Sequence, residues 1–213
     1  FNSVSFGGMF STYLFALIAA LPFAAEHAAE RQSGMALYLV SRSGVKNYGI
    51  SKMLTAAIAG GLTLCLGSMI FVAVLSTQLQ LVRPSDLVEH AGLPYYSLLV
   101  SGDGIQYFFA AWYLLFLTGA LWASAAMCVS AFAPDRYVVI AFPFLLCFLM
   151  VQFARLLRIP NAVRLDMLLI GRAQWGSEIV SLLLAGTVIA LLVTGLTFVF
   201  CRRMKGVVQN GLC

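Results

Sequence analysis

The stretch EHAAERQSGMALYLVSRSGVKNYGISK, residues 26–52, separates two apolar runs of the chain and decides how the rest is arranged. Helices in a bundle are usually joined by two to eight residues, so this polar and basic segment is unusually long. Ser33-Gly34 interrupts its helical pattern, Met35–Val40 is apolar, and Ser41–Lys46 is polar and basic again. This order is typical of a short helix that lies on a membrane surface with its apolar face against the bundle. A structured connection of this kind predicts a docking surface for a component outside the membrane.

Outward from this segment, five apolar runs are long enough to cross the hydrocarbon core of a bilayer, which takes about 20 residues. They are Gly7–Ala25, Met53–Leu79, Ile105–Ala133, Tyr137–Ala154 and Ile179–Cys201. The chain is 62% hydrophobic and only 10% charged, whereas soluble domains are about 25% charged. No strand-like alternation of useful length is present. The sequence therefore predicts an all-α, polytopic transmembrane helix bundle, with five spanning helices visible in one domain over residues 1–213.

The start of the chain does not resemble a signal peptide. The first residue is Phe1, and no basic n-region precedes the first apolar run. We expect a further spanning helix upstream of this residue, which makes six in the intact chain.

Small residues predict where the helices meet most closely. Ala56 with Gly60, and Gly119 with Ala123, have the four-residue spacing that lets two helix backbones approach each other. Pro22 removes a backbone donor and predicts a bend near the end of the first span.

The distribution of charge predicts the orientation. The Glu26–Lys52 segment, the Pro134–Arg136 turn and the tail after Cys201 fall on one side, with eight basic and three acidic residues. The other side carries five of each. By the positive-inside rule the first side is cytosolic. We expect an integral, multi-pass protein of the plasma (cell inner) membrane with a cytosolic C-terminus, and the absence of any Asn-x-Ser/Thr acceptor favours a bacterial source.

The last external segment, Arg155–Gly176, combines Ile159-Pro160-Asn161 with an apolar stretch, Leu165–Ile170, that is too short to span. This predicts a re-entrant hairpin that dips into the outer leaflet. Its arginines have two interpretations, contact with lipid phosphates or attraction of an anionic substrate; they are Arg155, Arg158, Arg164 and Arg172.

Several chemical functions are disfavoured. The chain has no Gly-Lys pair and hence no phosphate-binding loop. No ionisable residue lies well inside a predicted span, which argues against an ion-coupled carrier and an intramembrane hydrolase. His27 and Glu30 have a spacing that suits a metal, but a polar cluster at the helix end is the simpler interpretation. The five cysteines lack CxxC spacing and indicate neither disulfides nor zinc. We predict no catalytic, cofactor-binding or metal-binding residue and no nucleic-acid partner.

A resemblance to a known family adds to this pattern. The run Glu30–Met35 together with Leu37, Leu39, Ser41, Val45, Lys46, Tyr48 and Lys52 resembles the loop between the second and third helices of ABC-2 type permeases. These are the membrane subunits of type V ABC exporters. The family pattern is E-R-x-x-G-T, several leucines, S-x-P-[small]-S-R, an aromatic residue and a lysine that opens the next helix. The chain departs from it at three positions: Met35 replaces Thr, Ser43 replaces Pro and Lys46 replaces Arg.

The resemblance implies that the chain is the membrane-spanning subunit of an ATP-driven exporter and not itself an enzyme. A separate cytosolic ABC ATPase would bind ATP and Mg²⁺, and a second permease subunit would complete a homodimer or a heterodimer embedded in membrane lipid. In the family this segment is the coupling helix, which sits in a cleft of the ATPase. The residues expected to couple to the ATPase are Glu30, Arg42, Lys46 and Tyr48 as contacts, Gly34 as the bend and Lys52 as the membrane-edge anchor. No substrate-binding residue is predicted.

Two other functions stay open. A non-transport membrane scaffold or assembly factor would use the same basic loop to dock a partner protein or anionic lipid without ATP. A neighbouring gene for a Walker-containing ATPase would distinguish an exporter from this scaffold. A secondary carrier would instead transport with an ion gradient alone.

Overall fold

The computed structural model describes residues 8–77, 95–101, 105–133, 135–161, 163–173 and 175–209. Every regular element in these ranges is a helix, which confirms the predicted all-α class. The helices are α2 (Gly8–Ala20), α3 (Ala24–Gln32), α4 (Met35–Ser43), α5 (Val45–Ser76), α7 (Tyr96–Ser101), α8 (Ile105–Ser130), α9 (Arg136–Leu156), α10 (Leu165–Leu169) and α11 (Glu178–Gln209). Four of them, α5, α8, α9 and α11, are long and apolar enough to cross a membrane.

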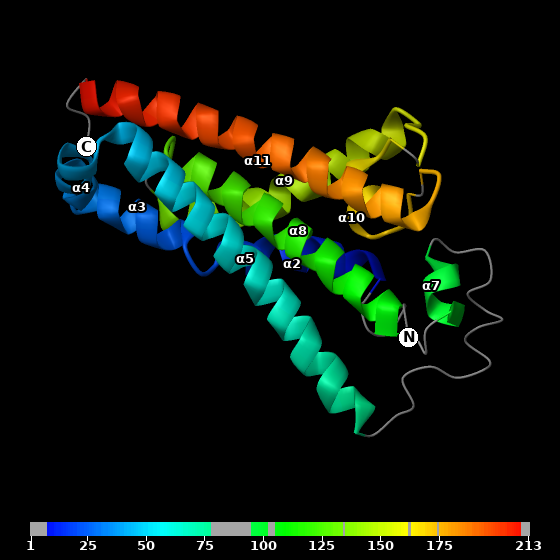
Figure 1. Ribbon diagram of the computed structural model, residues 1–213. Coiled ribbons are helices and arrows are strands. Elements are labelled where there is room, and N and C mark those ends of the chain that lie inside the picture. Colours follow the sequence, from blue (N-terminus) through cyan, green and yellow to red (C-terminus); the bar gives the residue numbers. More distant parts are fainter. Residues whose placement is uncertain are drawn as a thin grey trace.

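Helix α8 forms the centre of the bundle, with α2, α5, α9 and α11 packed around it. Figure 1 shows α3, α4 and the C-terminal end of α11 at one end of the long helices, and α7 and α10 toward the other end. The described connections therefore divide between two ends of the bundle. Which end faces the cytosol stays a prediction of the charge pattern. The basic residues of the Glu26–Lys52 segment lie at the same end as those that close α11.

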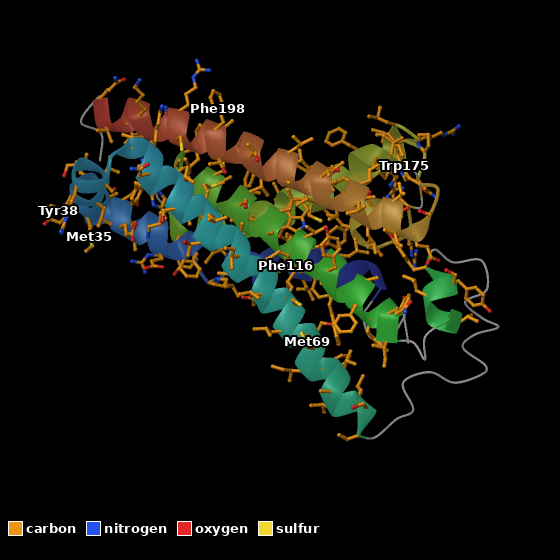
Figure 2. The ribbon with its side chains drawn as sticks, viewed as in Figure 1. Met35, Tyr38, Met69, Phe116, Trp175 and Phe198 are labelled. Carbon is orange, nitrogen blue, oxygen red and sulfur yellow. The ribbon has the colours of Figure 1, made fainter. Side chains whose placement is uncertain are left out.

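The outer helices α5 and α11 expose large apolar side chains along their length. On α5 the exposed residues Leu54, Ile58, Leu62 and Leu66 recur every four positions and form one face. Figure 2 shows Met69 of α5 and Phe198 of α11 directed away from the bundle. Apolar faces of this size are stable when lipid covers them, which fits a protein that resides in a membrane.

The predicted first span, Gly7–Ala25, is not one continuous helix. Within the described residues α2 ends at Ala20, a turn over residues 21–23 contains Pro22, and α3 begins at Ala24. Pro22 cannot donate a backbone hydrogen bond, so the helix stops where the sequence predicted only a bend. The structure describes 13 residues of α2, and the candidate spanning helices within the described residues do not include it.

Helix α5 begins earlier than the sequence predicted. The expected span starts at Met53, whereas the helix starts at Val45 and runs for 32 residues. Gly44, with a φ of +79°, sets its beginning, and no proline interrupts the chain between Gly44 and Ser76. The predicted single surface helix is therefore replaced by α3, α4 and the first two turns of α5.

The contact between α5 and α8 depends on glycine. A Cβ atom at Gly60 would overlap the Cβ of Ala123 and would lie 2.8 Å from the carbonyl oxygen of Gly119. A Cβ at Gly119 would overlap the backbone of Gly60. The close approach predicted from the small-residue spacing is confirmed, and it brings the two backbones nearer than any larger side chain permits.

The segment after α9 folds back along the bundle, as predicted. Leu168 and Leu169 of α10 pack in one apolar cluster with Leu117 and Leu121 of α8 and Ile189 of α11. These partners lie well inside their own helices, so α10 packs against the side of the bundle, mainly on α8. The depth that this segment reaches in a bilayer stays a prediction.

Candidate functional site

The two short helices α3 and α4, residues 24–44 with the turns that follow them, form what we call the connector. Gly34 separates the two helices with a φ of +73°, and Gly44 separates α4 from α5 with a φ of +79°. This left-handed conformation costs other residues about 1–2 kcal/mol, which explains why glycine occupies both turns. The structure places Gly34 at the bend where the sequence put it.

Helix α4 presents two different faces. Ala36 and Val40 are buried against the bundle, whereas Met35 and Tyr38 are 55% and 65% exposed. Figure 2 shows Met35 and Tyr38 at the end of the molecule, pointing away from it. Arg42 is also exposed and follows Tyr38 by four positions, so the three residues share the outer face of α4. The prediction that the Met35–Val40 run packs inward is right for Ala36 and Val40 and wrong for Met35 and Tyr38.

Four polar residues join the connector to α5, and we call them the connector cluster: His27, Glu30, Tyr48 and Lys52. Lys52 Nζ donates to Glu30 Oε1 at 2.5 Å. The Tyr48 hydroxyl donates to Glu30 Oε2 at 2.8 Å and lies 3.1 Å from His27 Nδ1. Glu30 thus receives one hydrogen bond on each carboxylate oxygen, both from α5.

The proton on the imidazole can be assigned from this geometry. Tyr48 has a single hydroxyl proton, and it points to the Glu30 carboxylate, which can only accept. The Tyr48 oxygen must therefore accept from His27, so Nδ1 carries a proton. In the neutral ring Nε2 is then unprotonated, and in this fully buried position it has no hydrogen-bond partner within the described parts of the chain.

Burial and hydrogen bonding set the charges of the cluster in opposite ways. Desolvation lowers the pKa of His27 to about 4, although the neighbouring Glu30 carboxylate acts against this shift. Desolvation also opposes the charged form of Glu30, but the hydrogen bonds from Lys52 and Tyr48 outweigh it and lower its pKa. At neutral pH the cluster therefore holds a neutral imidazole beside an ionised Glu30–Lys52 pair.

Because of His27, we expect the stability of the protein to fall with pH between 6.5 and about 4. An unfolded imidazole takes up its proton near pH 6.5, whereas the folded protein resists protonation down to a pKa of about 4. The unfolded state binds more protons in this window, so the free energy of unfolding decreases as the pH falls. Thermal unfolding of the detergent-solubilised protein across this range measures the effect.

His27→Asn provides the control for this prediction. The asparagine amide replaces the Nδ1 donor but does not titrate. The decrease between pH 6.5 and 4.5 should disappear, and only the decrease caused by protonation of Glu30, below its ordinary pKa of 4.5, should remain. The same pH dependence in the variant and the wild type would contradict the assignment to His27.

Further contacts fix the connector to the other helices at this end. Arg31 Nη1 donates to the carbonyl oxygen of Ser130, the last residue of α8, at 2.8 Å. The ring of Phe200 on α11 lies 5.3 Å from that of His27. The connector therefore rests on α5, α8 and α11 together.

The predicted coupling residues fall into two groups. Glu30, Tyr48 and Lys52 meet one another inside the connector cluster, with Tyr48 buried and Lys52 only 21% exposed. Arg42 and Lys46 are exposed and take no part in that cluster. The polar cluster that the sequence predicted around His27 and Glu30 is confirmed. Its partners from α5 were not predicted, although the four-residue spacing of Tyr48 and Lys52 places both on one helix face.

A second polar site lies at the opposite end of the bundle. Arg164 donates to both carboxylate oxygens of Asp166, at 3.2 and 2.6 Å, and the two side chains are 9% and 5% exposed. Arg164 was expected to contact lipid phosphates or an anionic substrate. Its guanidinium instead pairs with the Asp166 carboxylate inside the fold.

Within the described parts of the chain, no group of three or more His, Cys, Asp or Glu side chains is arranged to hold a metal ion. The pair of His27 and Glu30 belongs instead to the connector cluster. Comparison with protein-family models, with curated proteins and with solved structures finds no match to this chain.

Proposed function

We propose that the chain is the membrane-spanning subunit of an ATP-driven exporter of the ABC-2 type, located in a plasma membrane with the connector on the cytosolic side. A separate ABC ATPase docks on the outer face of α4 and supplies ATP and Mg²⁺. A second permease subunit, identical or similar, completes the translocation path. The observation that carries this proposal is the exposure of Met35, Tyr38 and Arg42 side by side at the end of the bundle.

The composition of this face favours a protein partner over a lipid surface. Tyrosine, methionine and arginine are the residue types enriched in protein–protein interfaces. Anionic lipid contributes only about 1 kcal/mol per basic residue, and the outer side of α4 with the start of α5 presents two, Arg42 and Lys46. Lipid binding by the connector alone would therefore be weak.

The mechanism that we propose is mechanical. Closure of the ATPase dimer around ATP pushes on α4, and the bends at Gly34 and Gly44 let α4 change its angle to its neighbours. The movement reaches α5 and switches access to the path between the two permease halves. Such a switch requires that the ATPase contact α4 differently in its open and closed states.

Charge reversal on the exposed face tests the docking. Arg42→Glu combined with Lys46→Glu is expected to abolish co-purification with the proposed ABC ATPase, because both substitutions place repulsive charge where the partner is expected to be complementary. Neither residue belongs to the connector cluster, so the fold should be retained.

The matched control carries the same change at the other end of the bundle. Arg158→Glu with Arg172→Glu reverses two exposed arginines near α10 and should leave ATPase binding unchanged. Equal binding by both double variants would contradict docking on α4. Binding of the wild type to anionic vesicles, without any ATPase, would favour the scaffold alternative.

A further inference from the structure

The connector cluster contains two of the residues expected to contact the ATPase, Glu30 and Tyr48, and the expected membrane-edge anchor, Lys52, yet their polar atoms face one another. Glu30 Oε1 and Oε2 are both engaged, by Lys52 at 2.5 Å and by Tyr48 at 2.8 Å. The Tyr48 side chain is buried, and its hydroxyl also contacts His27 at 3.1 Å. A partner that docks on α4 meets Arg42 and Lys46 but not these groups.

The four residues come from two helices that are not consecutive along the chain. His27 and Glu30 lie on α3, and Tyr48 and Lys52 lie in the first two turns of α5. Between them the chain passes through Gly34 and Gly44, whose backbones leave open space around them. The peptide link between α3 and α5 is therefore bent at two glycines, whereas the side-chain link is short and direct.

We propose that His27, Glu30, Tyr48 and Lys52 form a latch that makes α3 and the start of α5 move as one body. His27 is a positioning residue: its Nδ1–H holds the Tyr48 oxygen, so that the hydroxyl proton is directed to Glu30. The force that the latch transmits comes from the ATPase, so the transmission rests on the proposed function. The rigid link between α3 and α5 does not depend on the proposed function.

The surroundings of His27 favour a permanent latch over a pH sensor. Facing the imidazole are Glu30 and Arg31 from α3, Lys52 and Tyr48 from α5, and the uncharged ring of Phe200 from α11. Burial lowers the pKa of His27 to about 4, so the ring stays neutral at the pH of any cytosol. A second proton would place an N–H at Nε2, which has no hydrogen-bond partner among the residues that the structure describes.

Tyr48→Phe is the sharpest test, because it removes one oxygen atom and leaves the ring. Without the hydroxyl, both His27 Nδ1–H and Glu30 Oε2 lose a partner. Tyr38→Phe is the matched control, since it makes the same chemical change on the exposed face of α4. Glu30→Gln is a second variant. It weakens the latch because it removes the negative charge of the carboxylate to which Lys52 and Tyr48 both donate.

The first experiment needs no ATPase. Spin labels are introduced through unnatural amino acids at Glu26 on α3 and Leu62 on α5, both exposed, in the full chain in nanodiscs. The wild type and Tyr38→Phe should give one narrow distance distribution. Tyr48→Phe and Glu30→Gln should lose it and give a broad one. A narrow distribution in either latch variant, as sharp as the wild type, would overturn the latch.

The second experiment adds the ATPase. Labels at Leu62 on α5 and Leu145 on α9 report whether α5 moves when the complex is trapped with ATP and vanadate. The wild type and Tyr38→Phe should show a shift in distance, whereas Tyr48→Phe should keep the ATPase bound but lose the shift. A shift of wild-type size in Tyr48→Phe would contradict transmission through the latch. Failure of the wild type to bind any ATPase would refute the proposed function and leave the first experiment's result standing.

Discussion

Gly60→Val is expected to prevent α5 and α8 from packing, with loss of the folded protein from detergent extracts. Even the first added carbon overlaps Ala123 and approaches the Gly119 carbonyl oxygen to 2.8 Å, and the backbone of a helix cannot yield as a flexible side chain can. Overpacking in a core costs about 1–3 kcal/mol, and more where backbone is displaced. Because domains are stable by only about 5–15 kcal/mol, we expect the largest loss of stability at this position.

Gly67→Val on the same helix is the matched control. Gly67 lies two turns from Gly60, and a Cβ there has nothing within 4 Å. Both variants carry the same loss of glycine flexibility and the same β-branched side chain, so a difference between them reports the contact alone. Size-exclusion profiles and thermal unfolding measure it. Similar behaviour of the two variants would show that α5 and α8 do not meet at Gly60.

Asp166→Ala is expected to destabilise the protein by about 3–5 kcal/mol, because it leaves the charge of Arg164 buried without its partner. Arg164 is only 9% exposed, and the neighbouring α10 residues pack against α8 and α11. We expect α10 to leave its position against the side of the bundle. The midpoint of thermal unfolding should fall accordingly.

The double variant Arg164→Met with Asp166→Leu separates charge from packing. Removal of both charges with similar side-chain volume is often neutral in a buried pair, so the double variant should be more stable than Asp166→Ala. A double variant that is less stable than the single one would show that the attraction between Arg164 and Asp166 itself holds α10. It would contradict the explanation that the single variant loses stability because one charge is left unpaired.

The sequence predicted the bundle from features that act within one helix. The apolar runs gave all four long helices, and the small-residue spacing located the contact of Gly60 with Gly119. Helix ends were less predictable because they depend on single breakers. Pro22 ends a helix that hydropathy alone continues, and Val45–Lys52 extends α5 because nothing after Gly44 interrupts it.

The candidate site was predicted only in part, because its chemistry depends on pairings between helices. The sequence predicts a partner contact for three polar residues, Glu30, Tyr48 and Lys52. It does not reveal that Tyr48 and Lys52, which lie 18 and 22 positions after Glu30, donate their hydrogen bonds to its carboxylate. The sequence similarly predicts an external charge at Arg164, because it does not reveal that Arg164 forms an ion pair with Asp166 inside the fold. Exposure, in contrast, follows from helix periodicity once the buried Ala36 and Val40 fix the inner face of α4.

Docking on the outer face of α4 is the claim on which the functional account depends, and photo-crosslinking measures it most directly. A photoreactive amino acid at Tyr38, which is 65% exposed, is irradiated in native membranes with and without ATP. The account predicts a crosslink to a Walker-containing ATPase, whose yield changes with nucleotide. Crosslinks to phospholipid alone in both conditions, or a label accessible only from the exterior, would contradict it.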